Sequence, residues 1–157
     1  MTSTAAEATE FTLAFTVKNP HKEKSLNRQV QQGALTLIRL GNDSLAADDP
    51  AFGDLTLATD AAEVSIQEYW FRGGWFDNLG VWWRDFTAPG PLRNRTYPAG
   101  TGVGQDHASL AARLTVPGGG TGKIRFVLTW NYPNATKCSG GASITRWTWN
   151  CSAPTRG

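Results

Sequence analysis

The sequence has little of several features that mark common classes of protein. It holds two cysteines and two histidines in 157 residues, too few for a disulfide framework or for a zinc site with clustered ligands. Its apolar runs, such as residues 126–128 (FVL), fall far short of the roughly 20 residues that span a bilayer. Fifteen basic and thirteen acidic residues are spread along the chain, which argues against a nucleic-acid partner.

The amino terminus also lacks the features of a secretion signal. Residues 1–10 (MTSTAAEATE) are small and polar, with neither a basic start nor an apolar stretch. We therefore expect a flexible leader and a cytoplasmic location. The remaining length suits one domain.

What the sequence does have is seven tryptophans and a repeated alternation of apolar and polar residues. Alternation with period two predicts strands that are buried on one face. We expect an all-β fold, a β-sandwich that is either complete or lacks a strand. The PGGGTG segment between the last two runs below predicts that they form a hairpin. The expected strands lie at residues 11–17, 35–40, 55–59, 64–71, 108–116 and 124–132, and a further one at 144–149.

One segment has a helical period instead. In WFDNLGVWWRDF, apolar residues fall at offsets 0, 4, 7, 8 and 11, which is the apolar stripe of a short helix over residues 75–86. Gly73-Gly74 precedes this segment and Pro89-Gly90-Pro91 ends it. We expect a connecting helix whose aromatic side lies on a sheet or on a partner.

The sequence motifs that could bind a ligand or metal fail on their spacing. PGGGTGKI has Pro117 and Ile124 where a P-loop needs glycine and a hydroxyl residue. Asp48-Asp49-Pro50 could offer oxygens to calcium, but this pattern is more often a turn. We therefore expect no cofactor and no metal site.

Catalytic candidates are equally sparse. Glycoside hydrolysis needs two carboxylates that face one pocket, and the one carboxylate in an aromatic-rich strand is Glu68. Arg72 is in phase with it, so an ion pair between the two explains a carboxylate on that face better than catalysis does. No serine sits in a G-x-S-x-G elbow. A small hydrolase that depends on Glu68 stays open as an alternative.

The tryptophans have two interpretations. Trp75, Trp82 and Trp83 belong to the helical stripe, and Trp75 and Trp82 in particular are typical of a core or an interface. Trp70, Trp147 and Trp149 are freer to stack on a sugar, which keeps a stand-alone carbohydrate-binding module as a second alternative.

The two cysteines, Cys138 and Cys151, lie near the carboxyl end and flank a two-glycine turn. A disulfide across a hairpin is geometrically possible, but the sequence cannot fix the separation of their Cα atoms. Whether the two are bonded stays open.

Four blocks of the sequence carry a family likeness, in the same order along residues 11–134. The chain resembles the N-terminal domain of family 116 glycoside hydrolases, the non-lysosomal glucosylceramidases and bacterial β-glucosidases. The most specific segments are ADDPAFG and YWFRGGWFD. The blocks are FTLAFTVKNPHKEK, SLAADDPAFGDLTLAT, SIQEYWFRGGWFDNLGVWWRDFTAPGPLRNR and DHASLAARLTVPGGGTGKIRFVLTWNYPN.

The resemblance implies a two-domain retaining β-glucosidase in which this β-sandwich packs on a C-terminal (α/α)₆ barrel. The barrel would supply both catalytic carboxylates, so no catalytic residue maps onto this chain. It would act on β-glucosides or a glycolipid. Glu68, Trp70, Arg72, Trp75, Trp82 and Trp83 become candidates for the surface that meets the barrel.

The chain departs from the family pattern in three places, and the first is that the strands expected upstream of Phe11 are absent. Residues 21–30 look too short for the strand expected there, and residues 135–157 match nothing in the pattern. We expect the latter to form a divergent C-terminal hairpin or tail.

Overall fold

The computed structural model of the protein describes residues 1–102 and 104–134. Seven strands and one helix are present in these residues. The helix is α1 (Asp77–Thr87). The strands are β1 (Thr9–Lys18), β2 (Leu26–Gln32), β3 (Leu35–Gly41), β4 (Asp54–Thr59), β5 (Glu63–Gln67), β6 (His107–Val116) and β7 (Phe126–Asn131).

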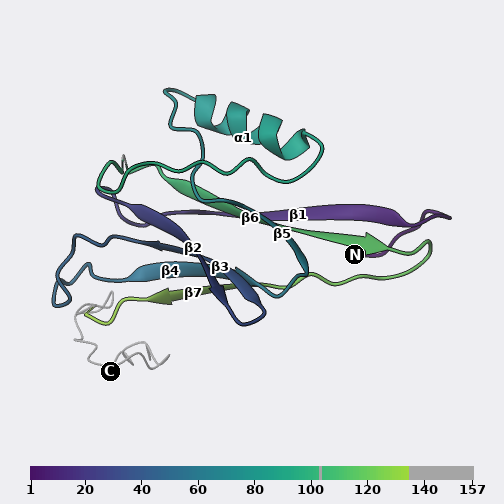
Figure 1. The fold of residues 1–157 in the computed structure, drawn as a ribbon, viewed down its shortest axis with the longest axis horizontal. Helices are drawn as coiled ribbons and strands as arrows, with labels where there is room; N and C mark the ends of the chain where they lie inside the picture. Colours follow the sequence, from purple (N-terminus) through teal and green to yellow (C-terminus); the bar gives the residue numbers. More distant parts are fainter. Residues whose placement is uncertain (103, 135–157) are drawn as a thin grey trace, which may run out of the picture.

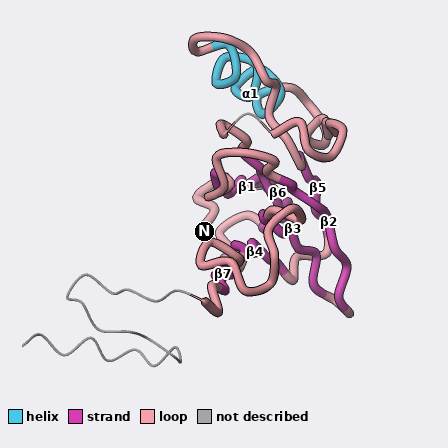
Figure 2. The backbone as a smooth tube through the Cα atoms, turned by 90° about the vertical axis from the view of Figure 1, so that its left-hand side faces the viewer, coloured by secondary structure: helices cyan, strands magenta, loops and turns pink. Residues whose placement is uncertain are grey.

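The strands form two antiparallel sheets, which confirms the predicted β-sandwich. One sheet has the order β1-β6-β5 and the other has the order β2-β3-β4-β7. Helix α1 lies on the outer side of the three-stranded sheet, away from the four-stranded one (Figures 1 and 2). The order of layers is therefore helix, three-stranded sheet, four-stranded sheet.

Alternation along the strands builds the core between the sheets, because successive side chains of a strand point to opposite faces. Leu57 of β4 and Leu110 of β6 are fully buried and belong to the same apolar cluster. At one side of the sandwich, Phe15 of β1 meets Phe126 of β7 with ring centroids 5.8 Å apart. The buried cluster consists of Ile38, Leu40, Leu57, Ile66, Ala108 and Leu110.

The predicted hairpin between the strands at 108–116 and 124–132 is wrong. β6 pairs with β1 on one edge and with β5 on the other, so it has no free edge for β7. β7 pairs with β4 in the opposite sheet. The glycine-rich link between β6 and β7 is a crossover between layers.

The expectation that residues 21–30 lack a strand is also wrong. β2 begins at Leu26 and pairs with β3 over its whole length. The two strands join through a tight turn at Gly33, whose φ of +59° is a left-handed conformation that glycine adopts at little cost.

The amino-terminal residues contact the glycine-rich link. The Ser3 amide donates to the Gly120 carbonyl at 3.0 Å, and the terminal amino group donates to the Gly122 carbonyl at 2.9 Å. The flexibility expected for residues 1–10 stays a prediction, and the hairpin or tail expected at 135–157 lies outside the described residues.

Candidate functional site

Large apolar side chains gather on the exposed side of helix α1 and the turn before it. Trp75 is 96% exposed, Phe76 is 79% exposed and Trp83 is 58% exposed. Several large apolar residues exposed on one short segment are typical of interaction sites. We call this set the aromatic surface. It consists of Phe71, Trp75, Phe76, Leu79 and Trp83.

The opposite side of the helix packs on the three-stranded sheet through a row of stacked rings. Phe86 stacks on Trp82 with centroids 5.2 Å apart, and Trp82 stacks on Trp70 at 5.1 Å. Trp70 in turn stacks on His107 of β6 at 4.7 Å. Both faces of the Trp70 ring are therefore covered, which leaves no face on which a sugar could stack.

One hydroxyl group fixes this row to the sheet. Ser109 Oγ accepts hydrogen bonds from Trp70 Nε1 at 2.8 Å and from Trp82 Nε1 at 3.0 Å. Its own proton can then go to Thr16 Oγ1, 2.8 Å away. Ser109 is fully buried. These three bonds use the one donor and both acceptor positions of its hydroxyl group. The helix is held to the sheet by directed polar bonds as well as by apolar contact.

Trp75 lies just before the helix and is 96% exposed, which decides between the two interpretations of this residue, core and interface. Its φ is +54°, a left-handed conformation that costs a bulky residue about 1–2 kcal/mol. With this backbone the Trp75 side chain is almost fully exposed to solvent. The core interpretation of Trp75 is therefore excluded, and the interface interpretation is the one that its exposure favours.

The predicted strand over 64–71 ends early, at Gln67. Tyr69 then turns inward, where it is 3% exposed and its hydroxyl accepts a hydrogen bond from the Asn27 amide at 2.8 Å. Glu68, Trp70 and Arg72 consequently do not share one strand face. The predicted ion pair between Glu68 and Arg72 is wrong for this reason.

Arg72 pairs instead with Asp106, just before β6. Its Nε and Nη2 atoms donate to the two carboxylate oxygens at 2.8 and 2.9 Å. The arginine side chain is 14% exposed and the aspartate 1%. The Asp106 carboxylate also accepts a hydrogen bond from Ser25 Oγ at 2.5 Å. This buried, bidentate pair joins the turn before α1 to two distant loops.

Aromatic rings and a loop complete the surroundings of the guanidinium group. Its central carbon lies 4.1 Å from the ring centroid of Tyr97 and 5.1 Å from that of Tyr69. Nη1 donates to the carbonyl and the hydroxyl of Thr101, both at 2.9 Å. We call Arg72 together with Asp106, Ser25, Tyr97 and Thr101 the arginine clamp.

The Glu68 side chain links segments of the domain through hydrogen bonds. One carboxylate oxygen accepts a hydrogen bond from the Gln29 amide at 2.7 Å, and the other lies 3.4 Å from Asn94 Nδ2. The Glu68 amide in turn donates to Asn94 Oδ1 at 2.7 Å. These bonds connect the end of β5 to β2 and to the loop after α1.

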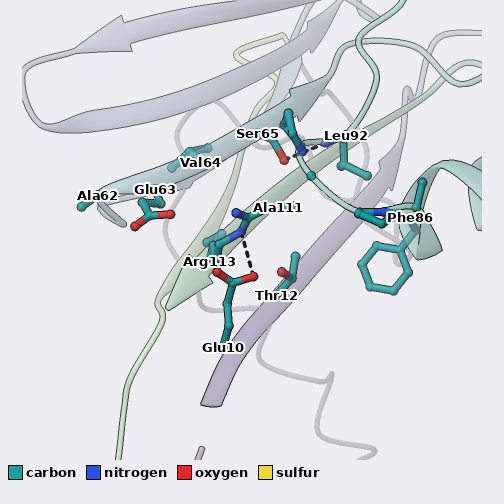
Figure 3. A pocket seen from close by; sticks show the side chains of 15 residues that line it. Glu10, Thr12, Ala62, Glu63, Val64, Ser65, Phe86, Leu92, Ala111 and Arg113 are labelled. Atoms are coloured by element: carbon teal, nitrogen blue, oxygen red, sulfur yellow. Dashed lines mark hydrogen bonds and ion pairs between the residues drawn. The ribbon is translucent and has the colours of Figure 1, made fainter. Parts of the chain in front are cut away.

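A shallow groove of about 450 Å³ lies on the outer face of the three-stranded sheet, beside the end of α1 (Figure 3). It contains two carboxylates, Glu10 and Glu63. Arg113 lies between them: it is the cross-strand partner of Glu63 and forms an ion pair with Glu10 at 3.5 Å. A glycosidase needs its two carboxylates to face the scissile bond, whereas here an arginine separates them. The groove suits binding of polar groups better than hydrolysis.

The other expectations concern residues or features away from these sites. No group of three or more His, Cys, Asp or Glu side chains gathers as metal ligands in residues 1–102 and 104–134. In the same residues, α1 is the one helix, and it is too short to cross a membrane. Cys138, Cys151, Trp147 and Trp149 lie outside the described residues.

The sequence did not predict the residues that hold Arg72 and Trp70 in place. Asp106 is 34 positions from Arg72, and Ser109 is 39 positions from Trp70. No local spacing rule connects residues this far apart. The usable signal for Asp106 was its position directly before an alternating strand, where a carboxylate is more often taken as part of a turn.

Comparison with known families agrees with the architecture. The family model described as beta-glucosidase 2, glycosyl-hydrolase family 116 N-term, matches residues 1–152. The match includes residues 135–152, so the expectation that this part of the sequence falls outside the family pattern is wrong. A search of curated proteins finds none that matches. Because the family model covers almost the whole sequence, the chain belongs to the family of N-terminal domains of glycosyl-hydrolase family 116 β-glucosidases.

Proposed function

We propose that this domain is a non-catalytic module that docks through its aromatic surface on the catalytic domain of a family 116 β-glucosidase. The observation that carries the proposal is the large exposed apolar area on α1 and the turn before it. An N-terminal domain of this family implies a catalytic domain in the same protein, which supplies a partner that can cover this area.

The composition of the aromatic surface fits a protein partner. Interfaces concentrate aromatic residues at their centre and place charges at the rim. Here Trp75, Phe76 and Trp83 are exposed, and Asp77 and Arg84, each next in sequence to one of these aromatic residues, are exposed charged residues. Burying one large apolar side chain contributes about 1.5–3 kcal/mol. A few such residues are enough to sustain a specific interface.

In this proposal the catalytic domain carries out hydrolysis. It is a C-terminal (α/α)₆ barrel that supplies the nucleophile and the acid/base carboxylate and acts on β-glucosides, glucosylceramide-type glycolipids among them. The domain described here shapes and stabilises the barrel from one side. Glu68 supports this division, because its carboxylate is used in hydrogen bonds to β2 and to the loop after α1.

Isothermal titration calorimetry tests the docking proposal. The protein is titrated into a separately expressed catalytic domain of a family 116 β-glucosidase. We expect saturable binding that Leu79→Asp weakens at least tenfold, because the substitution places a charge in the apolar interface. Val30→Asp, on an exposed position of β2, is the matched control and should bind like the unchanged protein. Equal binding by all three proteins would contradict the proposal.

A second candidate function is carbohydrate binding by exposed tryptophans. Trp75 and Trp83 favour it, because each presents an exposed ring on which a sugar could stack. Trp70 argues against it, because Trp82 and His107 cover its two faces. A titration of tryptophan fluorescence with β-glucosides separates the two candidates: saturation indicates a carbohydrate-binding module, and no change is expected for the docking module.

A further inference from the structure

We propose that Trp75 is the anchor of the docking surface and that its indole ring enters an apolar pocket of the catalytic domain. This inference rests on the proposed function. It adds that one residue dominates the interface and that the catalytic domain has a pocket for it. Apolar contact alone would need only a flat surface. Interfaces often depend on a few aromatic residues of this kind.

The position of the ring is the first argument. Trp75 is 96% exposed, the highest value among the large apolar residues of the described chain. Trp83, in contrast, lies against its own helix, with ring centroids 6.2 Å from Trp82 and 6.0 Å from Phe86. A partner can reach only part of Trp83, whereas it can surround Trp75. A ring that is surrounded when bound needs a pocket.

The backbone of the turn is the second argument. Trp75 has a φ of +54°, which a tryptophan rarely adopts. Gly73 makes the turn possible, because a Cβ atom at this position would lie 2.7 Å from Asp77 Cβ and 2.7 Å from Phe71 Cε1. The chain therefore keeps an unfavourable conformation whose visible result is the outward direction of one indole ring. Strain of this kind is typical of functional positions.

The third argument is that the chain segment before Trp75 is held in place. Arg72, three residues before Trp75, is held by two bonds to Asp106 and two bonds to Thr101. Its own amide donates to the Tyr97 hydroxyl at 3.2 Å. The turn thus starts from a buried, fixed point and ends in α1. A backbone that is already fixed at its base loses less entropy on binding, which strengthens association.

The test compares Trp75→Ala with Trp83→Ala in titration calorimetry against the same catalytic domain. Both residues are tryptophans of the aromatic surface, so the same side chain is removed in both variants, and the variants differ in where that side chain sits and how much of it a partner can reach. We expect Trp75→Ala to raise the Kd about 30-fold or more and Trp83→Ala to raise it less than tenfold. Thermal unfolding serves as the folding control, and Trp75→Ala should leave the melting temperature unchanged because its ring contacts solvent.

The outcomes separate this inference from the proposed function. If Trp75→Ala binds as well as Trp83→Ala while Leu79→Asp still weakens binding, the anchor is wrong and the docking function stands. If the unchanged protein does not bind the catalytic domain, both are overturned. Phosphatidylcholine vesicles are a further probe: partitioning that Trp75→Ala abolishes, without binding to the catalytic domain, would replace the protein pocket with a lipid surface.

Discussion

The arginine clamp makes the most specific stability prediction, through the substitution Arg72→Ala. Asp106 is 1% exposed and is paired with Arg72, whose side chain is 14% exposed. Removing the guanidinium group leaves a buried carboxylate whose remaining hydrogen-bond donor is Ser25. Breaking a buried ion pair from one side costs about 3–5 kcal/mol. We therefore expect Arg72→Ala to lower the free energy of unfolding by roughly that amount.

Urea titration followed by near-ultraviolet circular dichroism measures this loss, and thermal unfolding should agree with it. For a domain of this size, each kcal/mol shifts the melting temperature by roughly 2–4 °C, so a fall of roughly 6–20 °C is expected. The stability of Arg72→Lys should lie between that of the unchanged protein and that of Arg72→Ala, because lysine keeps the charge but cannot bond both carboxylate oxygens in the way arginine does.

The control is the exposed ion pair between Arg28 and Asp43, whose side chains are 61% and 52% exposed. Such pairs contribute about 0–1 kcal/mol, so Arg28→Ala should change stability little. A loss in Arg72→Ala no larger than that in Arg28→Ala would refute the view that the clamp organises the turn before α1.

Three further predictions concern the core, the surroundings of Trp70 and catalysis. Leu57→Ala removes a side chain that is fully buried and should lower the free energy of unfolding by about 2–5 kcal/mol in a urea titration; a loss below 1 kcal/mol would contradict the assigned core. Burial lowers the pKa of His107 from its usual value of 6.5, so the unfolded chain takes up the proton first. The resulting stability is present above pH 6.5 and is lost as the pH falls through the lower pKa of the folded protein. Unfolding midpoints measured from pH 7.5 to 5 should therefore fall more steeply than in His107→Gln, and parallel curves would disprove this. The protein alone should not hydrolyse nitrophenyl β-glucoside, and turnover that Glu68→Gln abolishes would establish a catalytic role instead.

The sequence contains enough information to predict most of the strands, because burial between two sheets requires period-two alternation. The partners of those strands were harder to predict. The glycine-rich link suggested a hairpin, but β1 and β5 already occupy both edges of β6. β2 was missed because its exposed residues, RQVQQ, show little apolar alternation.

The sequence predicts the candidate site only in part, because the contacts between distant residues are not visible in it. The aromatic spacing predicts the helix within two residues of its observed start, but it leaves open whether Trp75 belongs to the core or to an interface. A left-handed φ at one residue moved that ring to the surface, and apolar periodicity carries no information about φ. Arg72 was matched with Glu68, a neighbour in sequence, because Asp106 comes near only after the two loops fold together.

Hydroxyl-radical footprinting of the complex with the catalytic domain tests the docking claim most directly, because it reports the solvent exposure of individual aromatic side chains. The account predicts strong protection of Trp75, Phe76 and Trp83 on binding, and unchanged oxidation of Leu35 at the exposed start of β3. Protection of Leu35, with Trp75 still oxidised as fast as in the free protein, would contradict it.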